Sequence, residues 1–152
     1  MITKVEIAHR DSVPTVVVKR EGVAQQHLPE LFDATFARFH AAITEGLVQP
    51  SGPAVAMYTR MAETLDVEIG FPGQLAEADP NLTESSLPGG LIARAEYWGG
   101  YEGLPLAWAE FVKDVAAKGH EPAGPCWELY VTQPTPDMDP AALRTDLCCV
   151  VA

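Results

Sequence analysis

The chain of 152 residues carries a formal net charge of −11, and 47% of its residues are hydrophobic. This length predicts one domain with a hydrophobic core, and the composition excludes an intrinsically disordered chain. Nucleic acids and anionic membranes require a basic surface, so the negative charge argues against both as partners.

The N-terminus and the cysteines predict a cytoplasmic protein. Residues 1–6 mix charges into a strand pattern without the apolar segment of a signal peptide, and no apolar run approaches the roughly 20 residues that span a bilayer. Cys126, Cys148 and Cys149 are an odd number without metal-ligand spacing, so we expect reduced thiols. The histidines also lack ligand spacing and no phosphate-binding loop is present, so neither a metal nor a cofactor is expected.

Hydrophobic periodicity places two strands before a first helix and two strands after it. From Leu28 onward apolar residues recur at helical spacing, with Pro29 in the first turn and Gly46 at the end. The predicted elements of this half are strands at 4–9 and 15–20, a loop at 22–26, a helix from 28 to 46, and strands at 54–60 and 65–71.

The second half repeats this order after a polar, acidic stretch at 73–87, which is typical of a linker or a long hairpin loop. A second helix begins at Leu104-Pro105 and carries Leu104, Trp108, Phe111, Val112 and Val115 on one side. The predicted elements here are a strand at 90–97, a helix at 104–118, and strands at 126–133 and 145–151.

Marker pairs support an internal duplication. Leu28-Pro29 matches Leu104-Pro105, Gly52-Pro53 matches Gly124-Pro125, and Tyr58 then corresponds to Tyr130. We therefore predict a single domain over 1–152, built from a module at about 1–72, a linker at about 73–87 and a module at about 88–152.

Two strand–helix–strand–strand modules predict an α+β fold. The two modules should form one antiparallel sheet with both helices on the same face, which makes a two-layer sandwich with pseudo-twofold symmetry. A groove between the helices is then the natural place for a ligand.

Glu128 is the central candidate for a functional side chain. The side-chain period of two places Glu128 and Tyr130 on one face of their strand and Trp127 on the other. A carboxylate among aromatic residues suits the floor of a ligand site or a general base, although spacing alone favours a solvated position. In the repeat Glu128 corresponds to Ala56 whereas the tyrosines match, and this asymmetry favours a specific role.

The ordered set of motifs resembles the GyrI-like (gyrase-inhibitor-like) domain, the effector-binding domain of drug-sensing transcription regulators. The resemblance is carried by Val5-Glu6-Ile7, the acidic strand Asp66–Pro72, Leu87-Pro88-Gly89-Gly90, and Trp127-Glu128-Leu129-Tyr130. The family often has a histidine and a Gly-Pro pair before its second helix, where this chain has Tyr97 and Gly99-Gly100. No helix-turn-helix region precedes the domain, so a stand-alone version is expected.

This resemblance implies a broad groove that binds bulky aromatic or cationic small molecules, with Glu128 at its floor. Some stand-alone members hydrolyse the cyclopropane rings of DNA-alkylating natural products, which implies catalysis by Glu128 as general base with Tyr130 or Tyr97 bonded to a carbonyl. The alternatives are a non-catalytic protein that sequesters such drugs, or an inhibitor of an enzyme such as gyrase. In each case a monomer or a homodimer is expected. The ligand-binding residues expected besides Glu128 and Tyr130 are Trp127, Tyr97, Trp98, Tyr101, Trp108, Tyr58, Glu68 and Phe71.

Overall fold

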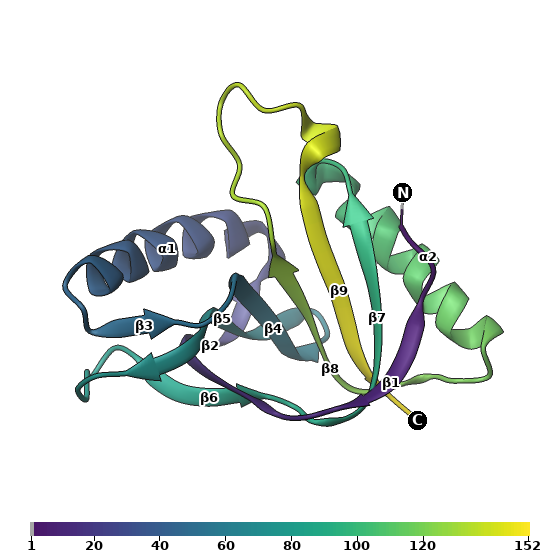
Figure 1. Ribbon diagram of the computed structural model, residues 1–152, viewed down its shortest axis with the longest axis horizontal. Coiled ribbons are helices and arrows are strands. Elements are labelled where there is room, and N and C mark those ends of the chain that lie inside the picture. Colours follow the sequence, from purple (N-terminus) through teal and green to yellow (C-terminus); the bar gives the residue numbers. More distant parts are fainter. Residues whose placement is uncertain (1) are drawn as a thin grey trace. The chain divides into compact units, whose positions relative to one another are not determined.

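A computed structural model describes residues 2–152, and this part of the chain contains nine β-strands and two α-helices (Figure 1). The chain divides into two compact units, which we call the first unit (residues 12–88) and the second unit (residues 2–11 and 89–152). Within each unit the strands pair antiparallel. The predicted α+β class is therefore confirmed.

In the first unit the strands lie in the order β4-β5-β2-β6, with the short β3 paired to β5. Helix α1 packs on one face of these strands through Phe39 and Ala42, which contact Val16, Val18 and Val48. The elements are β2 (Val13–Ala24), a 3-10 turn (Gln25–His27), α1 (Leu28–Thr44), β3 (Val48–Pro50), β4 (Ala54–Met61), β5 (Thr64–Leu75) and β6 (Thr83–Leu87).

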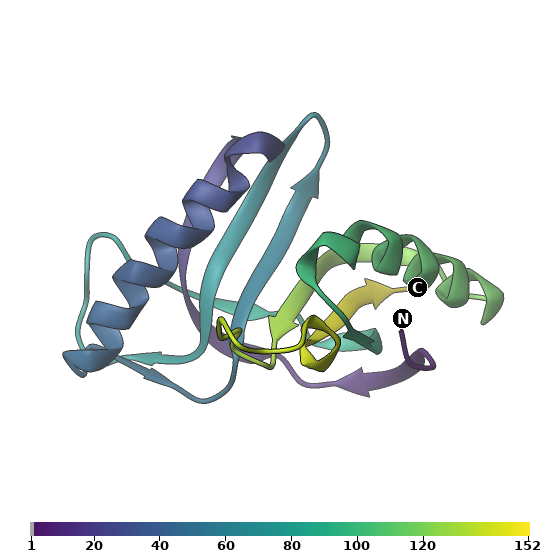
Figure 2. The same cartoon turned by 90° about the horizontal axis from the view of Figure 1, so that it is seen from above.

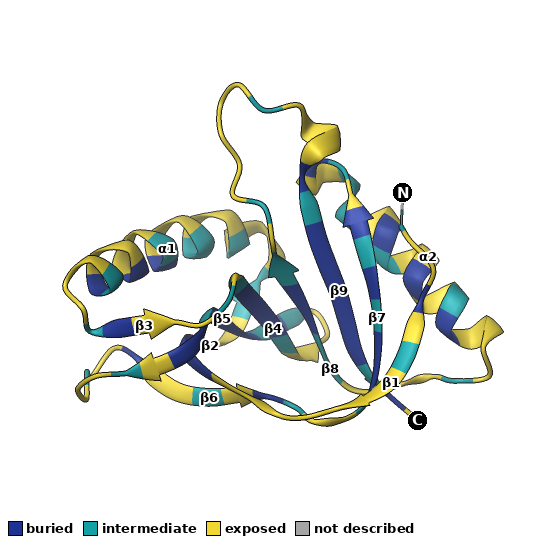
Figure 3. Cartoon of the chain, in the orientation of Figure 1, coloured by how far each residue is buried: buried dark blue, intermediate teal, exposed yellow. Residues whose placement is uncertain are grey.

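In the second unit the order is β8-β9-β7-β1, and α2 runs along one side of these strands (Figure 2). Strand β9 is one of the two inner strands and is buried along most of its length (Figure 3). The elements are β1 (Glu6–Arg10), β7 (Gly90–Trp98), the 3-10 turn η2 (Tyr101–Gly103), α2 (Leu104–Ala117), β8 (Pro122–Tyr130), the 3-10 turn η3 (Pro140–Ala142) and β9 (Arg144–Val151).

Both helices begin and end where the sequence predicts. Each has its proline in the first turn, where the missing N–H leaves no hydrogen bond unmade. Gly46 and Gly119 follow the helices with φ angles of 78° and 82°, a left-handed conformation that glycine adopts without steric cost. Val112 is an exception to the predicted apolar face, because its side chain is exposed. Ala107, which was not predicted to lie on that face, is buried.

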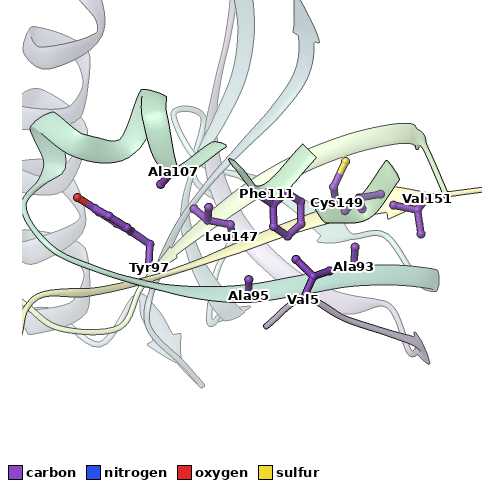
Figure 4. Close-up of a cluster of buried hydrophobic side chains, with 10 residues drawn as sticks. Val5, Ala93, Ala95, Tyr97, Ala107, Phe111, Leu147, Cys149 and Val151 are labelled. Carbon is purple, nitrogen blue, oxygen red and sulfur yellow. The ribbon is translucent and has the colours of Figure 1, made fainter. Parts of the chain in front are cut away.

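The core of the second unit forms between α2 and the strands β7 and β9 (Figure 4). Phe111 and Leu147 lie at its centre and have no exposed surface. Tyr97 belongs to the same cluster, with its hydroxyl at one end. The face of the strands that α2 covers is therefore the one that also carries Glu128, which pairs directly with Leu147.

The internal repeat is visible in the strand order, because β8-β9-β7-β1 has the same arrangement as β4-β5-β2-β6. Glu128 pairs with Leu147 as Ala56 pairs with Ile69, and Tyr130 pairs with Thr145 as Tyr58 pairs with Val67. The two edge strands do not follow the order of the repeat in the sequence, however. Strand β1 lies at the start of the first module but pairs with β7, whereas β6 lies just before the second module and pairs with β2.

Three local predictions are corrected. The stretch 73–87, expected to be a linker, contains β6, whose polar sequence lacks apolar alternation because it is an exposed edge strand. The loop expected at 22–26 is mostly strand, since β2 continues to Ala24 beyond an irregularity in its pairing with β5. Strand β8 ends at Tyr130 and not at Gln133.

The cysteines also differ from the expectation of three reduced thiols. Cys126 and Cys149 lie directly opposite each other on β8 and β9 and form a disulfide. Their pairing depends on the register of two strands that are far apart in sequence, which the spacing of the cysteines does not reveal. Cys148 is free and buried, and its burial raises the pKa of its thiol to about 12.

Within residues 2–152, neither α1 nor α2 is both long and apolar enough to cross a bilayer.

Candidate ligand-binding site

Glu128 is buried, with 6% of its surface exposed, and both of its carboxylate oxygens accept hydrogen bonds. The indole N–H of Trp108 on α2 donates to Oε2 at 2.6 Å. The Tyr130 hydroxyl, two residues further along β8, donates to Oε1 at 2.6 Å. The predicted placement of Glu128 and Tyr130 on one face is therefore correct, and these three side chains form one hydrogen-bonded group.

Two opposing effects act on the acidity of Glu128. Burial raises the pKa of the Glu128 carboxyl, because the charged form loses its hydration. The hydrogen bonds from Tyr130 and Trp108 favour the charged form and lower the pKa in part. The net direction is upward, so Glu128 is a stronger base than an exposed glutamate.

Tyr101 lies at the solvent side of this group. Its ring meets the Tyr130 ring edge to face, with centroids 5.9 Å apart and planes at 75°. Burial raises the pKa of the Tyr101 phenol, and the negative charge of Glu128 raises it further, so the hydroxyl remains a donor at neutral pH. The residue is 38% exposed and can contact a ligand.

Tyr97 lies in the core of the second unit. It is buried in the core cluster, and its hydroxyl donates to the Gly100 carbonyl at 2.8 Å. Gly99 and Gly103 surround this hydroxyl so closely that a Cβ at either position would collide with it. Tyr97 thus fixes the turn that carries Tyr101, and its part in a ligand site stays a prediction.

The opposite face of the second unit carries a separate polar cluster. Asp146 is fully buried there and bonds Arg94 and Arg144, and Trp98 donates its indole N–H to Glu96 at 3.0 Å. Trp98 and the buried Trp127 therefore lie on the face away from Glu128.

Three predicted residues belong to the first unit. Glu68 is buried and accepts a hydrogen bond from Ser85, at the position of β5 that corresponds to Asp146 of β9. Phe71 contacts Phe39 of α1, with ring centroids 5.4 Å apart. Tyr58 is half-buried on β4 and pairs with Val67. That these residues share a ligand with Glu128 remains a prediction.

The sequence interpretation missed Thr145. This residue lies on β9 between Tyr97 and Tyr130, which pair with it from the two neighbouring strands. It is fully buried, and its hydroxyl has no hydrogen-bond partner among the described residues. The internal repeat could have identified Thr145, because the corresponding residue of the first unit is the apolar Val67.

This arrangement provides a carboxylate, aromatic surfaces and phenolic donors, and its chemistry is that of ligand recognition or proton transfer. Among residues 2–152 no group of three or more His, Cys, Asp or Glu side chains is placed to hold a metal ion.

Solved structures with the same fold include proteins with several different roles. The EcmrR C-terminal domain matches with a TM-score of 0.78 and 13% identity over 97% of this chain and 96% of that one. This chain covers only 57% of the EcmrR chain in its complex with DNA. SAV2435 bound to tetraphenylphosphonium has a TM-score of 0.74 and 12% identity, over 99% and 94% of the two chains.

A hydrolase encoded by lin2189 from Listeria innocua matches more distantly, with a TM-score of 0.60 and 12% identity over 98% of this chain and 92% of that one. At these identities the similarities establish the fold alone. No curated protein sequence matches this chain.

The sequence itself matches the GyrI-like small molecule binding domain over residues 3–151, nearly the whole chain. The family resemblance inferred from the motifs is thereby confirmed, and the chain belongs to the family of GyrI-like small-molecule-binding domains.

Proposed function

We propose that this protein binds bulky aromatic cations and that Glu128 is the charged group that selects them. The observation that carries this proposal is a buried carboxylate whose hydrogen-bond donors, within the described residues, are the neutral Trp108 and Tyr130. Among residues 2–152 no Lys, Arg or His side chain forms an ion pair with Glu128. A bound cation supplies the missing positive charge.

The aromatic side chains around Glu128 support the same ligand class. Tyr101 and Tyr130 present ring faces and edges next to the carboxylate, and a delocalised cation gains from cation–π contacts with such rings. A related structure, SAV2435, is bound to tetraphenylphosphonium, a bulky aromatic cation. We therefore choose tetraphenylphosphonium as the probe.

Calorimetric titration with tetraphenylphosphonium at pH 8 tests this proposal. Glu128→Gln should weaken binding by at least about tenfold, which is about 1.4 kcal/mol, because the amide keeps the shape and removes the charge. Glu96→Gln is the matched control, since Glu96 is partly exposed on the opposite face and bonds Trp98. Equal affinities of wild type and Glu128→Gln would refute the role of Glu128.

A second candidate function is hydrolysis of cyclopropane-bearing electrophiles, and the raised pKa of Glu128 favours it. In this reaction Glu128 takes a proton from water while the water oxygen bonds to a cyclopropane carbon. The carbon–carbon bond breaks, and its electron pair moves through the conjugated ring to the carbonyl oxygen, which then receives a proton. One water molecule is added to the substrate in total.

The hydrogen bonds of the tyrosines suggest a role for each of them in this reaction. The Tyr130 hydroxyl donates to Glu128 and so orients the base, and the Tyr97 hydroxyl is bonded to Gly100. Tyr101, whose phenol stays protonated, is the remaining donor for the substrate carbonyl.

Mass spectrometry separates the two functions. The protein is incubated with a cyclopropane-bearing DNA-alkylating compound, and the product that has gained one water is followed over several turnovers. Turnover that Glu128→Gln abolishes while binding survives supports catalysis. Stoichiometric binding without product, in both wild type and variant, leaves the protein as a binder that sequesters its ligand.

A further inference from the structure

Thr145 is a buried polar residue that the interior of the second unit does not explain. It has no exposed surface, and its Oγ1 atom has no hydrogen-bond partner among the described residues. A buried hydroxyl without a partner destabilises the folded state, and valine has the same shape without the polar atom. Buried groups of this kind call for a specific explanation.

The internal repeat shows that valine suits this position. Val67 occupies the corresponding place in the first unit, where it pairs with Tyr58 and is 1% exposed. Thr145 pairs with Tyr130 in the same way. The second unit therefore differs from the first at two neighbouring positions, with Glu128 in place of Ala56 and Thr145 in place of Val67, and both differences add a polar group.

These two polar residues lie on the same face of the strands. Tyr97, Thr145 and Tyr130 form one row across β7, β9 and β8, and Glu128 lies in the next row of the face that α2 covers. The hydroxyls on either side of Thr145 are engaged, since Tyr97 donates to Gly100 and Tyr130 donates to Glu128.

We propose that the Thr145 hydroxyl is a specificity-determining group of the Glu128 site, and this inference rests on the proposed function. It selects ligands that carry a hydrogen-bonding group, such as an aromatic amine or a hydroxyl, beside the cationic ring system. A site that contains a buried polar group discriminates strongly against ligands that leave it unpaired.

Access to Thr145 depends on Tyr101. The Tyr101 ring packs against Tyr130, the neighbour of Thr145 in the row, and is 38% exposed. It follows Gly99-Gly100, and Gly99 has a φ angle of 155°. Because Thr145 has no exposed surface, a ligand must displace this ring to reach its hydroxyl.

Two cationic probes test the proposal. Tetraphenylphosphonium has no hydrogen-bonding group, whereas proflavine is a flat cation with two aromatic amines. Thr145→Val should weaken proflavine binding at least tenfold, leave tetraphenylphosphonium binding within twofold of wild type, and raise the melting temperature. Thr145→Ser restores a hydroxyl and should restore proflavine binding.

Thr15→Val is the matched control, because Thr15 is the other buried hydroxyl without a partner among residues 2–152 and lies in the first unit. It should raise the melting temperature and leave the binding of both probes unchanged. The proposal is overturned if Thr145→Val leaves proflavine affinity unchanged, or if it weakens both probes equally, which would indicate a packing effect. If the wild type binds neither probe, the proposed function fails and this inference fails with it.

Discussion

The indole N–H of Trp108 donates to Glu128 Oε2 at 2.6 Å and so connects helix α2 to strand β8. Trp108 reaches the strand because it is on the same helix face as Ala107 and Phe111, both of which are buried in the core. The ring of Trp108 also meets Phe111 edge to face, with centroids 5.3 Å apart. The carboxylate is thus held by a side chain whose own position is set by the core.

Trp108→Phe should destabilise the protein by about 1.5–3 kcal/mol, the usual contribution of a hydrogen bond to a charged group. Urea unfolding monitored by circular dichroism measures this change. Trp98→Phe is the matched control, because the Trp98 indole is 43% exposed and donates to Glu96 on the opposite face. We expect it to cost less than about 1 kcal/mol. Equal losses in the two variants would contradict the role of the Trp108–Glu128 bond.

The pH dependence of stability should reveal the buried charge of Glu128. Because its pKa is raised by folding, the carboxyl contributes stability below its unfolded pKa of about 4.3, and this contribution is lost as the pH rises through the folded pKa. Glu128→Gln does not titrate, and its amide can still bond both partners, since the Tyr130 hydroxyl can accept as well as donate.

The melting temperature of Glu128→Gln relative to wild type should therefore be higher at pH 8 than at pH 4. Differential scanning calorimetry at the two pH values measures this difference. A relative stability that falls between pH 4 and pH 8 would mean that folding lowers the pKa of Glu128.

Tyr97 and Gly103 should be energetically coupled. Tyr97→Phe loses the bond to Gly100 and should cost about 1 kcal/mol. Gly103→Ala places a Cβ against the Tyr97 hydroxyl and 3.2 Å from Cζ, which should cost about 1–3 kcal/mol through overpacking. In the double variant the hydroxyl is absent, so the two losses should not add. A double-mutant cycle should give a coupling of at least about 0.5 kcal/mol, and strict additivity would show that the turn relaxes around the added methyl group.

The disulfide between Cys126 and Cys149 should stabilise the fold. It joins residues separated by 23 positions, which corresponds to roughly 3 kcal/mol from the constraint on the unfolded chain. The double variant Cys126→Ala/Cys149→Ala should lose about this amount in urea unfolding. Alkylation of the native protein should label no cysteine, because Cys148 is buried and the pKa of its thiol is about 12. Labelling of Cys126 or Cys149 without a reductant would show that the disulfide is absent.

Much of the fold could be predicted because its signals are local. The hydrophobic periodicity after Leu28 and Leu104 predicted both helices, and the matched Gly-Pro and Leu-Pro pairs indicated the repeat. Strand β6 was not predicted, because it is a polar edge strand whose existence depends on pairing with β2. The pairing of β1 with β7 was missed for the same reason, since nothing in a strand's own sequence names its partner.

The candidate site was predicted in part. The period of a strand sufficed to place Glu128 and Tyr130 together, but the bond from Trp108 depends on how α2 packs on β8. The places of Tyr97 in the core and of Trp98 on the opposite face could not be predicted, because an aromatic residue looks the same in sequence whether it faces a core, a ligand or solvent. Their part in ligand binding stays a prediction. Thr145 attracted no notice because its significance rests on its missing hydrogen-bond partner.

The affinity for tetraphenylphosphonium as a function of pH tests the central claim most directly, because it links ligand charge to the ionisation of Glu128. We predict that the affinity of the wild type rises at least about tenfold from pH 4 to a plateau at higher pH, as Glu128 loses its proton. The affinity of Glu128→Gln should be weak and independent of pH over the same range. Parallel pH profiles for the two proteins would contradict the claim that Glu128 selects the cation.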